Sequence, residues 1–118
     1  MKKELEKRLI ELALKTNAIC KTLDNSYLSY HLTKQIIRSS TSAALNYGEA
    51  QVAESRKDFI HKLSIVLKEL KETSINLKLM AYNSKGHIKQ KIIGIEGECD
   101  HLIAIFHKTV LTARKNTK

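Results

Sequence analysis

Apolar residues recur along the chain in alternating steps of four and three, the spacing that places them on one face of an α-helix. The clearest example is 56–82, where two neighbouring rows follow the same seven-residue period. The rows are Phe59, Leu63, Val66, Leu70, Thr73, Leu77 and Met80, and beside them Ile60, Leu67, Ser74 and Ala81. Two rows on one helix give it more surface to bury than a two-stranded coiled coil needs. We therefore expect this helix to lie in a bundle, and the bundle to form an assembly.

Three other segments carry rows with this spacing and are predicted to be helices, over 3–22, 27–53 and 88–115. The rows of the first and last are Leu5, Leu9, Leu12, Thr16, Ile19 and Leu23, and Ile88, Ile92, Ile95, Cys99, Leu102, Phe106, Val110 and Ala113. Gly94 and Gly97 lie inside the last helix, where each costs about 1 kcal/mol relative to alanine. Two readings stay open, fraying of its first turns or tight packing of a neighbour.

The predicted helix over 27–53 has an unusual main row, because most of its members are small or polar. That row is Leu28, Leu32, Gln35, Ser39, Ser42, Asn46 and Ala50, and a second strip consists of Ile36, Ala43 and Tyr47. Small side chains let a neighbouring backbone approach closely. A buried Asn46 would need a hydrogen-bond partner and could fix the register of the helices.

Short polar segments separate the four predicted helices. Asp24-Asn25-Ser26 offers N-cap residues, and Ser55 precedes Asp58 with the spacing of a capping box. The segment 83–86 ends the third helix, with Gly86 or Asn83 suited to a left-handed residue. Because the connections are short, consecutive helices should be antiparallel. The sequence thus predicts an all-α protein, an antiparallel up-down-up-down four-helix bundle that forms a single domain over 1–118.

Composition agrees with long helices, because the 118 residues include no proline and only four glycines. No run of about 18 apolar residues exists, so we expect no membrane-spanning helix. The first residues, MKKELEKRL, lack the apolar core of a secretory signal, which favours a cytoplasmic location. Cys20 and Cys99 both fall on apolar helix faces, and we expect reduced thiols in the core.

The chain has a formal net charge of +9, from 21 basic and 12 acidic residues. The excess lies mainly towards the chain ends. A surplus of this kind attracts polyanions, although a solvated lysine-rich face that keeps a protein in solution is the alternative. Contacts to backbone phosphates would suit this surface best. The predicted nucleic-acid-binding residues are Arg8, Lys15, Lys57, Lys89, Lys91, Arg114 and Lys115.

The sharpest enzymatic hypothesis for a four-helix bundle is a two-metal carboxylate site, which needs Glu-x-x-His on two helices. The sequence offers Glu98 with His101 and, more loosely, Asp58 with His61. Each histidine follows a core position by two residues, a rotation of about 200°, so both imidazoles should point outward. Glycine-rich phosphate loops and G-x-S-x-G are also missing. We therefore expect no enzyme, no metal site and no cofactor.

The stretch from Arg38 to Met80 carries the residues of a family resemblance. They are Arg38-Ser39-Ser40, Ser42, Asn46, Glu49-Ala50, Ser55, Lys57-Asp58-Phe59 and the following LSIVLKELKET. Through them, and more weakly through the rest of the chain, the protein resembles the four-helix bundle proteins of bacterial 23S rRNA intervening sequences. That superfamily includes the accessory variability proteins of diversity-generating retroelements. The resemblance implies a ring, typically a pentamer, with no enzyme activity. For the retroelement branch it implies binding to nucleic acid and to a reverse transcriptase.

Two hypotheses for function follow. The first is a ring-forming bundle that binds RNA or DNA through basic surfaces, since the helices over 27–53 and 56–82 carry more apolar and small surface than one bundle buries. The alternative is an oligomeric scaffold or adaptor for a protein partner such as a reverse transcriptase, without direct binding to nucleic acid. In that case the charge serves solubility.

Overall fold

The computed structural model describes residues 2–116, which contain four helices and no strand. Helix α1 spans Lys2–Cys20, α2 spans Tyr27–Gln51, α3 spans Arg56–Tyr82 and α4 spans Gly86–Lys115. The prediction of an all-α fold with four helices is confirmed, and each predicted boundary lies within two residues of the observed one. The heptad rows located these helices because tertiary packing buries those same rows.

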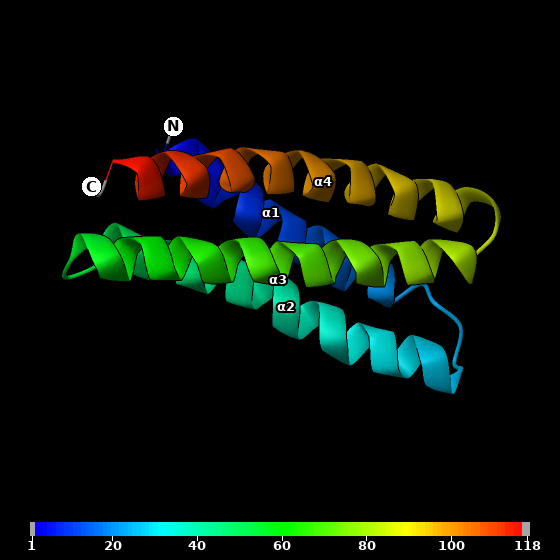
Figure 1. Cartoon of the computed structure of the whole chain (residues 1–118). Helices are drawn as coiled ribbons and strands as arrows, with labels where there is room; N and C mark the ends of the chain where they lie inside the picture. Colours follow the sequence, from blue (N-terminus) through cyan, green and yellow to red (C-terminus); the bar gives the residue numbers. More distant parts are fainter. Residues whose placement is uncertain (1, 117–118) are drawn as a thin grey trace.

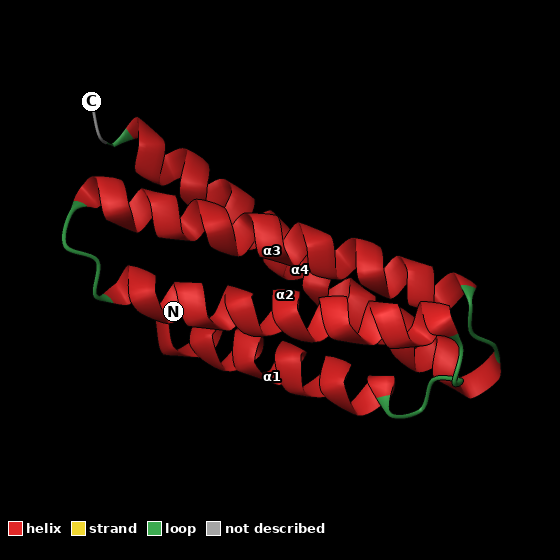
Figure 2. Ribbon diagram, turned by 90° about the horizontal axis from the view of Figure 1, so that it is seen from below, coloured by secondary structure: helices red, strands yellow, loops and turns green. Residues whose placement is uncertain are grey.

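The helices form an elongated antiparallel bundle of 49 × 21 × 20 Å. In Figure 1, α3 and α4 lie in front with their axes nearly parallel and their chain directions opposite, while α1 and α2 cross obliquely behind them. Both chain ends lie at the same end of the bundle as the connection between α2 and α3 (Figure 1). Contacts between α2 and α3 and between α3 and α4 are the most extensive, and those between α1 and α4 are the least. Figure 2 shows that short loops make all three connections.

Side-chain caps mark the starts of α2 and α3, as the sequence predicts. Ser26 accepts a hydrogen bond from the backbone N–H of Ser29 at 3.1 Å, and Asp24 Oδ1 accepts from both hydroxyls. Ser55 accepts from the backbone N–H of Asp58 at 3.0 Å. Each cap satisfies a donor that the first helical turn leaves unpaired. At the first residue of α4 the chain turns through Gly86, whose φ of 59° favours glycine.

The predicted rows of α1, α3 and α4 face the core, but on α2 the strip described as secondary is the one that is most deeply buried. Ile36 and Ala43 are fully buried and Tyr47 nearly so, whereas Leu28 is exposed. The ring of Tyr47 packs edge-on against Phe106, with centroids 5.4 Å apart. Burying these larger side chains removes more apolar surface from water, and this decides the rotation of α2.

The small polar residues of α2 nevertheless have a structural role. Ser39 Oγ and Thr73 Oγ1 lie 2.7 Å apart, and Ser40 Oγ lies 3.2 Å from Thr16 Oγ1, so hydroxyl pairs link α2 to both of its neighbours. All four residues are fully buried, and close helix packing is therefore combined with satisfied hydrogen bonds. Asn46 donates to the carbonyl of Ser42 within its own helix. The prediction that it fixes register between helices gains no support.

Two explanations were open for Gly94 and Gly97, fraying of the helix and tight packing of a neighbour. Both are wrong for the single chain. Helix α4 continues through them without interruption, and a Cβ built at either position would meet nothing within 4 Å. Both glycines are exposed.

Candidate nucleic-acid interface

The seven basic residues predicted to bind nucleic acid fall in separate parts of the bundle. Arg8 and Lys15 lie on α1 and Lys57 lies in the first turn of α3. The others follow α4 from one end to the other: Lys89, Lys91, Arg114 and Lys115. At 1.5 Å per residue, Lys89 and Lys115 are about 39 Å apart along the helix. The set therefore cannot form one compact site.

Arg8 is committed to an interaction inside the protein. Its guanidinium donates two hydrogen bonds to Glu98 on α4, Nε to Oε2 and Nη2 to Oε1, both at 2.9 Å. Nη2 also lies 2.9 Å from Nδ1 of His101. The side chain of Arg8 is 20% exposed and that of Glu98 is 32% exposed. This bidentate geometry is the strongest that a guanidinium and a carboxylate can adopt.

The ion pair changes the titration of both partners. The hydrogen bond from Arg8 holds the pKa of Glu98 below its ordinary value, against the opposing effect of partial burial. The same bond raises the pKa of Arg8. Both groups are thus charged at neutral pH, and Arg8 serves first as a bridge between α1 and α4. Its role in binding nucleic acid stays a prediction.

Lys15 and Lys91 are brought together where α1 faces α4. They line a hollow of about 350 Å³ together with Gly94 and Glu98. Its apolar floor includes Leu12 and Ile95. The absence of a side chain at Gly94 keeps this hollow open. Two lysines beside one paired carboxylate leave it positively charged.

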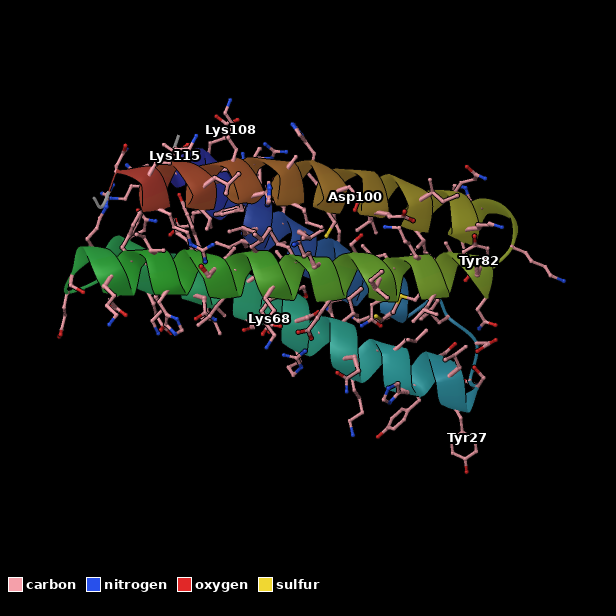
Figure 3. The ribbon with its side chains drawn as sticks, in the orientation of Figure 1. Tyr27, Lys68, Tyr82, Asp100, Lys108 and Lys115 are labelled. Carbon is pink, nitrogen blue, oxygen red and sulfur yellow. The ribbon has the colours of Figure 1, made fainter. Side chains whose placement is uncertain are left out.

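Lys57 and Lys115 lie at the end of the bundle that holds both chain ends. Arg56 and Lys57 line a depression of about 620 Å³ with Ile60 and with Asn116, the residue that follows Lys115. We call Arg56, Lys57, Lys108 and Lys115 the basic end. Figure 3 shows Lys108 and Lys115 on the outer edge of α4. No acidic residue occurs in the sequence after Asp100, and on the α3 side Glu54 and Asp58 are the carboxylates beside Arg56 and Lys57.

Arg114 and Lys89 occupy two further places. Arg114 donates to Ser64 Oγ at 3.2 Å and lines the groove between α3 and α4. Lys89 lines a hollow of about 400 Å³ near the other end of that seam, together with Tyr82 and Glu96. Their positions within one helix could be predicted, but their distribution over different surfaces could not.

The prediction omitted several lysines and arginines that share these surfaces, among them Arg56, Lys68, Lys71 and Lys108. Arg56 adjoins Lys57, and Lys68 and Lys71 are three residues apart, so adjacent or helical spacing of basic residues was the available signal. Figure 3 shows Lys68 extending outward from α3.

Ion pairs elsewhere in the bundle engage more acidic side chains than basic ones. Arg38 pairs with both Glu69 and Glu72, and Lys78 lies 3.4 Å from Glu96 and 3.6 Å from Asp100. With Arg8–Glu98 and Lys62–Glu49, these ion pairs within residues 2–116 join six acidic residues to four basic ones. The groups in these pairs together carry a net charge of −2, so the positive excess lies among the other residues.

The outward orientation predicted for His61 and His101 is confirmed, since both are exposed. Residues 2–116 contain no group of three histidine, cysteine or acidic side chains placed to hold a metal ion. Both cysteines have free thiols, and burial raises the pKa of Cys99 to about 12, so that thiol stays protonated. None of the helices in the described part of the chain is long and apolar enough to cross a membrane.

These features define a helical bundle with separate basic surfaces and a polar bridge between α1 and α4. Residues 2–108 match the family model described as 23S rRNA-intervening sequence protein. The chain belongs to this family, as the resemblance in its sequence predicted. No curated protein matches the chain.

A solved structure supports the same assignment. The chain is similar to a protein of unknown function from the S23 ribosomal protein family of Bacteroides thetaiotaomicron VPI-5482, with 30% identity and a TM-score of 0.78. The match covers 90% of this chain and 97% of that protein. The fold therefore extends through nearly the whole of both chains.

Proposed function

We propose that this protein is a non-enzymatic, cytoplasmic bundle that assembles as a pentameric ring and binds RNA or DNA through the basic end. One observation carries the proposal: Arg56 and Lys57 line a depression with Asn116 at the end of the bundle where α4 finishes, and no acidic residue follows Asp100 in the sequence. Phosphate contacts need such a concentration of lysine and arginine but no particular base-reading geometry.

The start of α3 adds to this field. The positive end of a helix dipole lies at the N-terminus, next to Arg56 and Lys57, and favours an anion there. Asp58 in the first turn offsets part of this effect. The outer edge of α4, with Lys108 and Lys115, extends the positive surface by about 10 Å along that helix. A nucleic-acid backbone following this edge would meet several cations in succession.

Assembly is supported by apolar side chains that a single bundle leaves exposed. On α2, Leu45 is 67% exposed and Val52 is 79% exposed, and on α1 Leu14 is 63% exposed. A ring with head-to-tail contacts needs two different faces on each copy, and α1 and α2 supply two. A ring would also place several basic ends on one assembly, which raises the avidity for a long nucleic acid.

The test is fluorescence anisotropy with a labelled single-stranded RNA of 20 nucleotides over a salt series from about 50 to 200 mM. We expect binding that weakens with salt. The double variant Lys57→Glu/Lys115→Glu should bind about tenfold more weakly. Its log–log salt slope should be shallower by about 1.4, because each phosphate contact to a single strand contributes about 0.7.

The matched control is Lys21→Glu/Lys85→Glu, which changes the net charge equally at the opposite end of the bundle. It should weaken binding less than about threefold. Equal effects of the two double variants, or no binding at the lowest salt, would contradict the proposal. Sedimentation that finds a single subunit at micromolar concentration would contradict the ring.

A further inference from the structure

The seam between α3 and α4 opens outward into a groove of about 820 Å³, the largest hollow described on the molecule. Its apolar lining comes from Leu67 and Ile75 on α3 and from Val110 and Leu111 on α4. Ile75 is 57% exposed and Leu111 is 47% exposed. Leucine and isoleucine side chains exposed together in a concave surface indicate a binding site.

The rim of this groove is basic. Lys68, Lys71 and Arg114 line it, and neither lysine forms an ion pair with a carboxylate of the described residues. Glu72 is the acidic residue that lines the groove, and its carboxylate pairs with Arg38 of α2. The groove therefore presents an aliphatic floor between positive edges.

We infer that this groove holds an amphipathic helix of an acidic protein partner. Leu67 and Ile75 are eight residues apart, so the floor extends for about 12 Å along α3, which is about two helical turns. A partner helix presents apolar side chains at i, i+3, i+4 and i+7 over this length. Its glutamate and aspartate side chains would lie against Lys68, Lys71 and Arg114. The inference is independent of the proposed nucleic-acid binding, which uses the basic end.

A second copy of this chain fits the groove less well, because lysines lie beside the exposed apolar side chains of both α1 and α2. The acids near those side chains include Glu6 and Glu49, and Glu49 is already paired with Lys62. Along α1, the outward positions around Ile10 and Leu14 continue through Lys3, Lys7 and Lys21. The outward row of α2 consists of Tyr30, Lys34, Ile37, Thr41, Leu45, Gly48 and Val52. Either face would bring lysines against the lysines of the rim, which is unfavourable.

Nucleic acid also fits the groove less well than an acidic helix. Single-stranded nucleic acids bind through stacking of bases on aromatic rings, and the only ring in the lining is the imidazole of His107. Phosphates could contact the rim, but the aliphatic floor would then remain in water. An acidic amphipathic helix uses both features at once.

The test uses a fluorescein-labelled synthetic 18-residue peptide with leucines at i, i+3, i+4 and i+7 and glutamates on its other faces. A peptide of the same composition, with its leucines redistributed around the helix, is the control probe. We expect the full-length protein to bind the first peptide at least about tenfold more tightly than the second, because only the first can bury all its leucines.

Variants then locate the site. Ile75→Ser and Lys68→Gln/Lys71→Gln should each weaken binding of the striped peptide by about tenfold. Leu45→Ser, which changes a similarly exposed side chain on α2, and Lys21→Gln/Lys85→Gln should change it by less than about twofold. Circular dichroism spectra should show that all four variants fold.

Four results would overturn the inference. Equal binding of the two peptides would remove the role of the apolar stripe, and equal effects of groove and control variants would remove the groove. Loss of RNA affinity in Ile75→Ser without any peptide binding would assign the groove to nucleic acid. Dissociation of an oligomer by Ile75→Ser would assign it to contacts between copies.

Discussion

Helix α4 packs against α3 on one side and against α1 on the other, and the two seams are built differently. The seam with α3 is extensive, and Cys99 of α4 donates to the carbonyl of Leu70 at 3.3 Å in its buried interior. The seam with α1 is the least extensive in the bundle. It combines an ion pair, Arg8–Glu98, with a hollow of about 350 Å³. The seam with α3 has the more extensive contact and also places Lys78 beside Glu96 and Asp100, whereas the seam with α1 has less contact and depends more on its single bridge.

This difference indicates where the bundle opens first. Local opening occurs where few apolar contacts must be broken, and α1 meets this condition along its α4 side. Its more extensive contact is the seam with α2, which includes the buried hydroxyl pair of Thr16 and Ser40. Lys15, the α1 lysine of the α1–α4 hollow, would move with α1.

The largest expected effect compares two fully buried leucines, Leu70 on α3 and Leu9 on α1. Leu70→Ala should lower the free energy of unfolding by about 3–5 kcal/mol and Leu9→Ala by about 2–3 kcal/mol, because α1 can shift to fill the cavity. Urea denaturation at one protein concentration measures both. If Leu9→Ala proved as costly as Leu70→Ala, the two seams would be equally rigid.

A smaller effect is expected from Glu98→Ala, which leaves the guanidinium of Arg8 without its carboxylate. We expect a loss of about 1–2 kcal/mol, less than for a fully buried pair because both side chains retain contact with water. Amide hydrogen exchange should accelerate in α1 more than in α3. Glu49→Ala, which removes an exposed carboxylate that pairs with Lys62, is the control and should leave exchange in α1 unchanged. Uniform acceleration over all helices would contradict a local role for the bridge.

The smallest expected effect is on the pH dependence of stability. Because the pKa of Glu98 is lowered in the folded state, its contribution is present above the ordinary carboxyl pKa of about 4.3 and is lost as the pH falls through the folded value. The wild type should therefore lose more stability than Glu98→Gln between pH 6 and pH 3, by less than about 1 kcal/mol. Parallel curves for the two proteins would show that the bridge contributes nothing to acid sensitivity.

Most of the fold could be predicted because local signals and tertiary packing agree. The row from Leu63 to Met80 is buried as its spacing predicts, and the caps Ser26 and Ser55 lie where the sequence places them. On α2 two neighbouring rows compete, and spacing alone cannot rank them. Their order depends on Phe106, a residue of another helix that contacts Tyr47.

The candidate site could be predicted only in part, because charge identifies basic residues but not their partners. Lys57 and Lys115 do lie in one basic end, yet Arg8 has the same charge and is bound to Glu98, 90 residues away in the sequence. The sequence also contains Arg56, Lys68 and Lys71, but only the structure shows which surfaces they line.

The sequence by itself determined the helices, their ends and the face that each of three helices buries, because these depend on spacing and capping within about one turn. The tertiary structure decided the rotation of α2, the pairing of Arg8 with Glu98 and the groove beside Ile75. Each of these depends on which side chains of different helices meet. No local pattern in the sequence specifies those contacts, because they depend on the volumes and charges of residues far apart in the chain.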